Sequence, residues 1–492
     1  MQHGRVSHRD LRGTRPPPLV ASRSLGILDE FRVPYRRDAG AVTDGWSSLG
    51  ASPPSRALYW PSICADRARA GFWLGEIPIW GSVAPEARVA VLAAALGGEW
   101  RPDVPVVDAR GTRYSSVWRS SEGGTIFPFD PDEVLWNWRT ERYRVQSGTA
   151  PAPAAVLRRL YYLVRRGLPR RLQISVRRAY ARLQARTRFP RWPIETALHD
   201  FCELVLAAAA DAAGEPLPYL SAWPAGHTWA LVLSHDVETA AGRDAIERVR
   251  RVEEAVGVRS SWNLVPERYA TDDGLVARLQ AAGAEVGVHG LRHDGRDLES
   301  LRTLSKRLPE IRRWADRWGA VGFRSPATHR VWEWMPMLGF EYDSSYPDTD
   351  PYEPMPGGCC SWLPFFNGDM VELPITLVQD HTAFVILGQG ESLWRAKIDC
   401  LRPRGGMALL LTHPDYLRDP ELLGSYERVL RAYAGDPTAW KALPREVSDW
   451  WRRRSATALE LVDGVWRPSG PAADEVEIRF AKPRAGSTRT AS

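Results

Sequence analysis

The sequence lacks long apolar runs and paired cysteines, and each absence excludes a class of protein. The runs at 89–96 and 407–411 are among its longest apolar stretches. They fall far short of the about 20 residues that a membrane-spanning helix needs. None of the five cysteines forms a C-x-x-C pair, which favours reduced thiols over a disulfide framework or a thiolate metal site.

The sequence also lacks a strong net charge and an apolar leader. Its 65 Lys and Arg against 59 Asp and Glu leave a charge of only +6, so we expect no nucleic-acid partner. Residues 1–20 are basic without the apolar core of a secretory signal, and we therefore expect a cytoplasmic protein. With 44% hydrophobic and 25% charged residues in 492, the chain has a globular composition and the length of about three domains.

One segment carries most of the basic excess. Residues 157–194 contain twelve Arg, no Lys and no acid, so the rest has 53 basic against 59 acidic residues. Four Arg pairs, at 158–159, 165–166, 170–171 and 177–178, predict two basic amphipathic helices broken near Pro169. Such helices favour contact with an anionic membrane surface or with a phosphate-bearing substrate carrier. For a cytoplasmic protein, that surface would be the inner face of the membrane. A solvated arginine face over a packed helix is the alternative.

The composition divides the chain into five predicted segments. Residues 1–40, rich in Arg, Pro and Ser, predict a disordered N-terminus, and 41–156, with eight of the 22 Trp, predict a separate α+β domain of unknown role. The basic helical segment and its linker cover 157–225. Residues 226–440 form the fourth predicted segment, and 441–492 a C-terminal extension with a polar tail.

Within 226–440, short apolar runs alternate with amphipathic stretches, which predicts a parallel sheet. The strand-like runs are 229–234, 259–265, 284–290, 320–325, 371–377 and 407–412, and the helix-like stretches are 243–256, 272–282, 298–318, 330–338 and 420–434. So many repeats favour a distorted (β/α) barrel of about seven strands over an open doubly wound sheet. Reactive groups in such barrels gather at the carboxyl ends of the strands.

Two acids follow the first predicted strand, in the run Ser-His-Asp-Val-Glu. Side chains alternate along a strand, so Asp236 and Glu238 share one face. Two neighbouring carboxylates are costly unless a cation or a proton lies between them. This pair therefore indicates a cation or a proton between the two carboxylates, with a solvated pair of loop acids as the alternative.

Two histidines follow the strand predicted at 284–290. His289 and His293 have H-x-x-x-H spacing, which on a helical turn places both imidazoles on one face, as metal ligands require. Gly287 and Gly290 allow a ligand or the backbone to approach closely. A surface pair of histidines is the alternative.

Two further strand ends carry single polar groups. Arg324 can hold a carboxylate bidentately, and His413 can serve as a general acid. A structural ion pair and a hydrogen-bonded core histidine are the alternatives. However, each group ends a different predicted strand, and seven of the ten His lie between 227 and 413, so together these residues indicate one site.

This order of motifs resembles the polysaccharide deacetylase family, also called the NodB-homology domain or carbohydrate esterase family 4. The resemblance implies a distorted (β/α) barrel and a divalent metal, often zinc, that serves to remove acetyl groups from N-acetylated sugars. By resemblance, Asp236 is the catalytic base and Glu238 the first metal ligand. His289 and His293 match the two metal histidines of the family.

The remaining motifs extend the resemblance. Arg324 matches the arginine that orients the base, and His413 the histidine that protonates the leaving group. Asp343 lies where a further aspartate is expected. The chain departs from the family at Glu238, which stands where aspartate is usual, so that the roles of Asp236 and Glu238 can be exchanged, and in the segment R-S-P-A, which lacks the glycine often found there.

The resemblance implies a metal-dependent deacetylase acting on an amino-sugar unit of a glycan precursor, in cell-surface polysaccharide biosynthesis. Trp332, Trp334 and Trp362 follow the strand ends and can stack on sugar faces, with packing in the core or a lid as the alternative. A related C–N hydrolase, such as a deformylase or a cyclic amide hydrolase, is a second hypothesis. A non-catalytic glycan-binding or assembly protein on the same barrel is a third.

Overall fold

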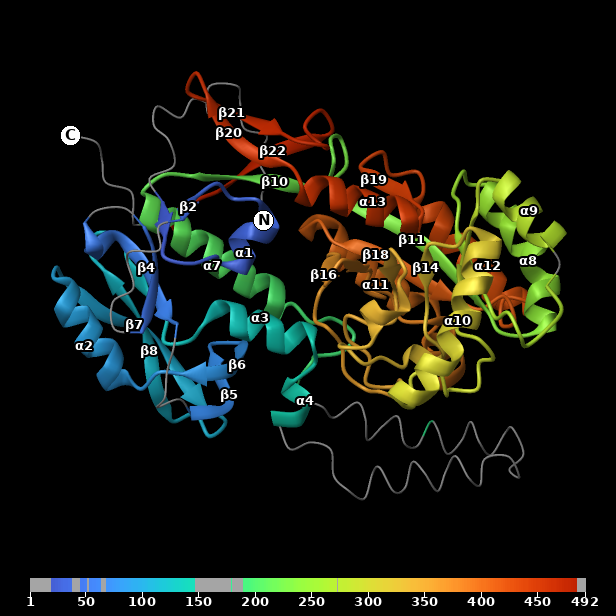
Figure 1. Cartoon of the computed structure of the whole chain (residues 1–492), viewed down its shortest axis with the longest axis horizontal. Coiled ribbons are helices and arrows are strands. Elements are labelled where there is room, and N and C mark those ends of the chain that lie inside the picture. The colour runs from blue at the N-terminus through green and yellow to red at the C-terminus, as the bar shows by residue number, and fades with distance from the viewer. Residues whose placement is uncertain are drawn as a thin grey trace. The chain divides into compact units, whose positions relative to one another are not determined.

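The computed structural model divides the chain into two compact units (Figure 1). It describes residues 19–37, 45–50, 53–62, 68–146, 178, 189–271 and 273–484. The parallel-sheet unit contains 153–195 and 222–452, and the mixed-sheet unit contains 2–152, 196–221 and 453–492. Within the described ranges, no helix combines the length and the apolar character needed to cross a membrane.

Two sequence predictions fall largely outside the described residues. These are the disordered N-terminus predicted for 1–40 and the two basic helices within 157–194. Residues 19–37 of the N-terminus are described, and there the prediction is wrong, because they form strand β1 (Val20–Ala21), helix α1 (Gly26–Phe31) and strand β2 (Arg36–Arg37), with Ile27 and Leu28 fully buried. Of the predicted Arg pairs only Arg178 is described, and its Nη2 donates to the carbonyl oxygen of Val385 at 2.9 Å.

The mixed-sheet unit is built on nine strands in the order β2-β1-β3-β4-β9-β8-β7-β5-β6. The strands are β1 Val20–Ala21, β2 Arg36–Arg37, β3 Trp46–Gly50, β4 Ala57–Pro61, β5 Ala68–Leu74, β6 Ile77–Val83, β7 Trp100–Asp108, β8 Arg113–Ser120 and β9 Thr125–Ile126. The helices are α1 Gly26–Phe31, α2 Glu86–Leu96, α3 Pro131–Arg139, α4 Tyr143–Gln146 and α7 Ala197–Ala213. Asp130 caps α3 by accepting a hydrogen bond from the amide of Asp132.

The C-terminal stretch contributes strands to this unit. β10 (Leu217–Pro224) pairs with β22 (Val476–Ala481), and β20 (Ala458–Val462) forms a hairpin with β21 (Val465–Ser469). Residues beyond 452 therefore return to the mixed-sheet unit, which explains why that unit consists of three separate stretches of chain.

The parallel-sheet unit has strand order β16-β17-β15-β14-β13-β12-β11-β18, with β19 also paired to β11. The strands are β11 Trp229–Val237, β12 Ser261–Leu264, β13 Glu285–Val288, β14 Gly322–Phe323, β15 Tyr342–Asp343, β16 Phe365–Asn367, β17 Met370–Glu372, β18 Met407–Thr412 and β19 Ala439–Ala442. Only β16 pairs antiparallel with its neighbour. The predicted parallel α/β sheet is thus observed, while the count of about seven barrel strands stays a prediction.

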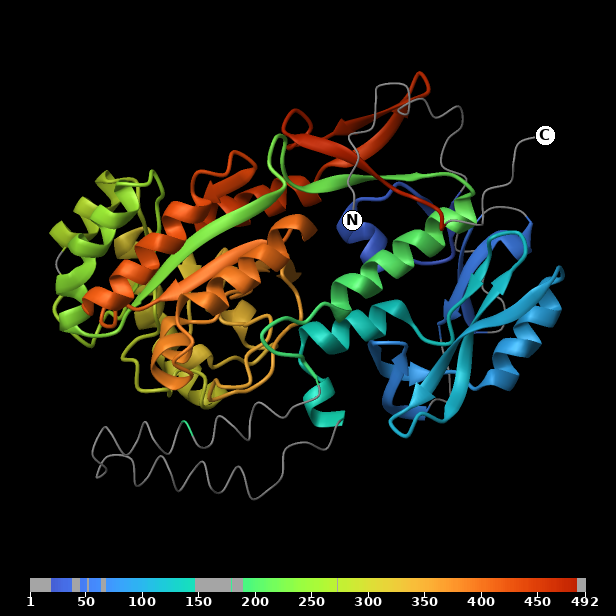
Figure 2. The same cartoon turned by 180° about the vertical axis from the view of Figure 1, so that it is seen from behind.

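β11 pairs with three other strands of this sheet, β12, β18 and β19. All nine of its residues are buried, as expected for a strand covered on both faces. It pairs with β18 along its length, and the two strands run side by side in both views (Figures 1 and 2). After β17 the chain turns back to β18, where the amide of Leu377 donates to the carbonyl of Leu409 at 3.0 Å.

Four helices of this unit were predicted from the sequence pattern, namely α8 Ala240–Glu254, α9 Asp273–Ala281, α10 Leu301–Trp318 and α12 Pro420–Tyr433. The helices α11 Glu391–Leu401 and α13 Pro444–Ser455 were not predicted. α10 begins at a Ser300 cap that accepts from the amide of Thr303, and it ends at Gly319 with φ 61°. Its buried residues, Leu304, Ile311, Ala315 and Trp318, lie on one face.

Several predicted elements are shorter than their patterns suggested, among them the strand predicted at 320–325, which is β14. For two others the sequence shows the physical reason. The strand predicted at 371–377 ends at Glu372, because Pro374 has no amide hydrogen for a ladder. The helix predicted at 330–338 is a single 3-10 turn, Met335–Leu338. Pro336 lies in its first turn and Gly339 follows with φ 71°, so the chain cannot extend an α-helix in either direction.

Candidate active site

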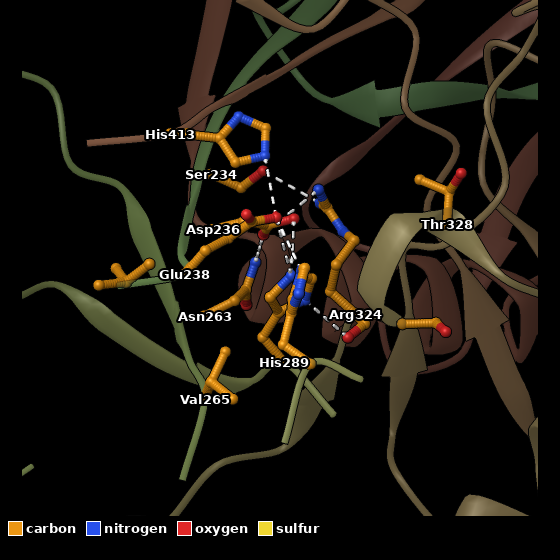
Figure 3. Close-up of polar contacts among 12 residues, drawn as sticks. Ser234, Asp236, Glu238, Asn263, Val265, His289, Arg324, Thr328 and His413 are labelled. Atoms are coloured by element: carbon orange, nitrogen blue, oxygen red, sulfur yellow. Dashed lines mark hydrogen bonds and ion pairs between the residues drawn. The ribbon is translucent and has the colours of Figure 1, made fainter. Parts of the chain in front are cut away.

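Six predicted site residues come together at the carboxyl ends of β11, β13, β14 and β18 (Figure 3). They are Asp236, Glu238, His289, His293, Arg324 and His413. The parallel direction of the strands places these ends at one edge of the sheet. Residues separated by up to 177 positions in the chain are therefore neighbours.

Glu238, His289 and His293 form a cluster of possible metal ligands. Each offers one ligand atom, and these atoms all lie within 4.8 Å of one another. The Nε2 of His293 is 2.8 Å from Oε1 of Glu238, and the Nε2 of His289 is 3.9 Å from the same oxygen. Asp236 is not part of this cluster, although its Oδ2 lies 3.6 Å from the Nε2 of His289.

The surroundings of the two imidazoles suit a cation. The Nδ1 of His289 donates to the carbonyl oxygen of Arg324 at 3.0 Å, which leaves the lone pair on Nε2 directed into the cluster. Within the described part of the chain, neither Nε2 makes a hydrogen bond of good geometry, although both atoms are buried. Two imidazoles and a carboxylate are a donor set typical of a catalytic zinc or similar divalent metal. The residues present thus fit such an ion.

Glu238 is held as a carboxylate. Burial acts to raise its pKa, but contacts with His289 and His293, together with the charge of His413, bring that pKa well below its usual value. The side chain remains 29% exposed, whereas His289 is buried. Glu238 is therefore both ionised and accessible from solvent.

The segment that carries His293 is a loop and not the helical turn that the sequence predicted. Gly290 and His293 both have positive φ, 64° and 53°. The side chain of Asp297 accepts from the amide of Leu291 at 3.1 Å, and a Cβ on Gly290 would lie 2.4 Å from the same oxygen. Arg307 of α10 in turn binds Asp297 at 2.6 Å. These contacts hold the loop in a conformation that a helix does not allow.

Asp236 is a buried, ionised carboxylate. Its Oδ1 accepts from Nδ2 of Asn263, its ladder neighbour in β12, at 2.9 Å. Burial acts to raise the pKa of Asp236, but the charges of His289, Arg324 and His413 bring it below the usual value. The group can therefore accept a proton at neutral pH.

Arg324 does not form the bidentate carboxylate contact that the sequence suggested. Its Nη1 is 3.7 Å from Oδ1 of Asp236, beyond hydrogen-bond distance. Its Nη2 donates instead to the hydroxyls of Ser234, at 3.0 Å, and Ser344, at 2.9 Å. Ser234 lies two residues before Asp236 on the same face of β11. Its hydroxyl therefore accepts a hydrogen bond from the guanidinium in place of the Asp236 carboxylate. Arg324 acts on Asp236 through charge.

His413 is paired with Asp380, a residue that the sequence analysis missed. The Nδ1 of His413 donates to Oδ1 of Asp380 at 2.7 Å, and its backbone amide donates to Oδ2 at 2.7 Å. Burial lowers the pKa of His413, but Asp380 outweighs this effect and raises the pKa to about 10. A signal existed in the sequence, since Asp380 follows the strand predicted at 371–377 as Asp236 follows the strand predicted at 229–234.

The three predicted tryptophans are not equivalent. Trp332 is buried, and its ring stacks on that of Phe365 with a centroid distance of 6.1 Å. Trp362 is buried as well, while Trp334 is half-buried. The burial of Trp332 and Trp362 favours the packing alternative, and stacking on sugar stays a prediction.

Comparisons with known proteins give a structural likeness only. Neither a scan against protein-family models nor a search of curated proteins found a match. The similar solved structures include a candidate polysaccharide deacetylase from Mycobacterium smegmatis, with 21% identity, TM-score 0.40, and coverage of 47% of this chain and 92% of that one. They also include Puue allantoinase, with 16% identity, TM-score 0.40, and coverage of 47% and 93%. The peptidoglycan deacetylase PdaC from Bacillus subtilis matches with 11% identity, TM-score 0.31, and coverage of 46% and 94%.

Proposed function

We propose that this protein is a metal-dependent hydrolase that removes the N-acetyl group from an amino-sugar unit of a glycan precursor, on the cytoplasmic side, in cell-surface polysaccharide biosynthesis. One observation carries the proposal. The ligand cluster of Glu238, His289 and His293 is flanked by a buried carboxylate, Asp236, and by a histidine held protonated, His413. Amide hydrolysis requires these three functions, and the motif order that resembles the deacetylases supplies the substrate class.

The ligand cluster supplies the electrophilic side of the reaction. Zinc held by Glu238, His289 and His293 would polarise the acetyl carbonyl and lower the pKa of a bound water towards about 7. Glu238 reaches this position from β11 with the longer side chain, whereas Asp236 stays with Asn263. We therefore assign the ligand role to Glu238 and the base role to Asp236.

Asp236 takes the proton of the attacking water in this proposal. Its carboxylate is kept ionised by the charge of Arg324, and its orientation is set by the hydrogen bond from Asn263. Because Oδ1 is occupied by Asn263, the proton goes to Oδ2, the oxygen that lies 3.6 Å from the Nε2 of His289.

His413 supplies the proton that the leaving amine needs. An amide nitrogen leaves very poorly as an anion, so an acid must protonate it as the C–N bond breaks. With Nδ1 bonded to Asp380, the acidic proton lies on Nε2, which is 3.6 Å from Oε1 of Glu238 and therefore at the edge of the ligand cluster. Asp380 keeps this proton on the ring at neutral pH.

The test is acetate release from free, oligomeric and nucleotide-linked N-acetylated sugars, measured with zinc content. We expect His289→Ala and His293→Ala to lose both activity and bound metal. His227→Ala is the matched control, because His227 precedes β11 at the end opposite the site and should change neither. Wild-type activity and metal content in both site variants would rule the proposal out.

The same assay separates the two other hypotheses. Release of formate, or opening of a cyclic amide, without acetate release would assign a related C–N hydrolase to the same residues. A protein that binds a glycan but takes up no metal after zinc supplementation would indicate a binding or assembly role.

A further inference from the structure

Two buried carboxyl groups meet beside the proposed site. Asp343 ends β15 and Glu372 ends β17, and the two residues are direct neighbours in the parallel ladder. They are 0% and 1% exposed, and each has one buried oxygen, Oδ2 of Asp343 and Oε2 of Glu372, that has no hydrogen-bond partner among the described residues. A hydrogen bond between two carboxyl groups requires a proton on one of them.

The remaining oxygens show where this proton lies. Oδ1 of Asp343 accepts from the hydroxyl of Ser345 at 2.7 Å, and Oε1 of Glu372 accepts from the amide of Tyr346 at 3.0 Å. One proton placed between Oδ2 of Asp343 and Oε2 of Glu372 would give both of these oxygens a hydrogen-bond partner.

Electrostatics favour one proton on the pair. Burial raises the pKa of both groups, and the charge of Asp343 raises that of Glu372 further. The guanidinium of Arg324 acts in the opposite direction on both pKa values. Repulsion between the two carboxylates prevents both from being ionised in this buried contact, while the positive charge of Arg324 favours one of them remaining negative.

The side chain of Arg324 is held by the segments that follow these two acids. Its Nη2 donates to the hydroxyl of Ser344, which donates to the carbonyl oxygen of Leu373 at 2.7 Å. Both hydrogen-bond partners of the guanidinium are neutral serines, and Asp236 lies 3.7 Å away. A buried cation with this arrangement needs a further counter-charge, and the acid pair supplies it.

The backbone beside Arg324 is tied to the same pair. The amide of Ser325 donates to the hydroxyl of Ser345 at 2.9 Å, and that hydroxyl donates to Asp343. Removing charge from the pair would therefore affect both the backbone and the guanidinium of this strand end.

We infer that Asp343 and Glu372 form a carboxylic acid–carboxylate pair, with one shared proton and one negative charge, that positions Arg324 toward Asp236. The inference rests on the proposed function, because the role of Arg324 is defined by that reaction. Both acids are positioning residues, and neither is placed in contact with the substrate.

Isosteric amides test the single charge. In Asp343→Asn or Glu372→Gln, the amide N–H replaces the shared proton and the remaining acid ionises, so one negative charge is kept. We expect each single variant of the full-length, zinc-loaded protein to stay within about 3-fold of wild-type kcat, and the double variant to lose about 10-fold or more with KM little changed. The inference would be overturned if the losses in kcat of the two single variants simply added in the double variant, or if the double variant kept the kcat of the wild type.

Infrared spectroscopy detects the shared proton without any activity. Wild-type protein at pH 7 should show the C=O stretching band of a buried carboxylic acid, and difference spectra should show that each single amide variant has lost it. Absence of this loss would overturn the inference even if the double variant does not fold. Because the band does not depend on turnover, it also separates failure of this inference from failure of the proposed function.

Glu285→Gln is the matched control for both measurements. Glu285 is another buried acid of this sheet, at the start of β13, and burial raises its pKa to about 7. The hydroxyl of Tyr342 donates to it at 2.7 Å. Its substitution should remove a separate acid band while leaving kcat within about 2-fold, because it lies at the opposite end of the strands from Arg324.

Discussion

The Nδ1 of His413 lies 2.7 Å from Oδ1 of Asp380, and the backbone amide of His413 donates to the other oxygen of the same carboxylate at 2.7 Å. Asp380 is fully buried. One side chain thus fixes both the orientation and the protonation of the proposed acid, and it links the segment after β17 to the end of β18.

Replacing Asp380 by Asn should shift the pH dependence of the reaction. In the wild type, His413 has a pKa of about 10 and stays protonated at neutral pH. Without the carboxylate, this pKa returns towards about 6.5, the ordinary histidine value, and the acid form is lost as pH rises through that range. We expect the alkaline limb of kcat/KM to move to lower pH by more than about one unit, with about a 30-fold loss at pH 8. An unmoved alkaline limb in the pH–rate profile would contradict the role of His413.

Arg307→Gln should weaken metal binding from a distance. Arg307 contacts Asp294 at 2.6 Å and Asp297 at 2.6 Å, and thereby holds the loop that carries His293. Without this contact the left-handed conformation of His293 can relax, so we expect about a 10-fold loss in zinc affinity. Competition with a chromophoric chelator measures it. Arg302→Gln, at an exposed position of the same helix, is the control, and equal affinity in the two variants would refute the prediction.

Gly290→Ala should destabilise the protein more than Gly295→Ala. Both glycines have positive φ, 64° and 74°, so both substitutions cost backbone strain. A Cβ on Gly290 would in addition lie 2.4 Å from Asp297 and 2.6 Å from Pro326, whereas the nearest atom to one on Gly295 is 3.6 Å away. We expect the free energy of unfolding to differ between the variants by about 1–3 kcal/mol. Denaturant titration measures this difference. Equal free energies of unfolding in the two variants would contradict the prediction, because they would show that the loop rearranges to accommodate the new Cβ.

Neutralising the four Arg pairs within 157–194 should weaken binding to anionic liposomes. The segment carries twelve Arg and no acid, and each basic residue near an anionic surface contributes about 1 kcal/mol of attraction. Hydrolysis of a small N-acetylated sugar should be unchanged, since no residue of the proposed site lies in this segment. Co-sedimentation with vesicles tests the prediction, and unchanged binding would favour the solvated arginine face.

The sequence by itself determined the type of sheet and the position of the reactive groups along it. Alternation of apolar runs with amphipathic stretches predicted the strands β11, β12, β13 and β18 and the helices α8, α9, α10 and α12. Because parallel strands share one carboxyl edge, Asp236, His289 and His413 could be expected to meet before any coordinates were known. These inferences need only local periodicity and the direction of the chain.

Only the tertiary structure decided which side chains pair. Asp380 meets His413 because the chain after β17 turns back to β18, and Asp343 meets Glu372 because of the register between β15 and β17. Register and chain path depend on packing between residues far apart in sequence, which periodicity does not report. For the same reason the sequence indicated a position for Arg324 at a strand end but not its serine partners, which lie on two other strand ends.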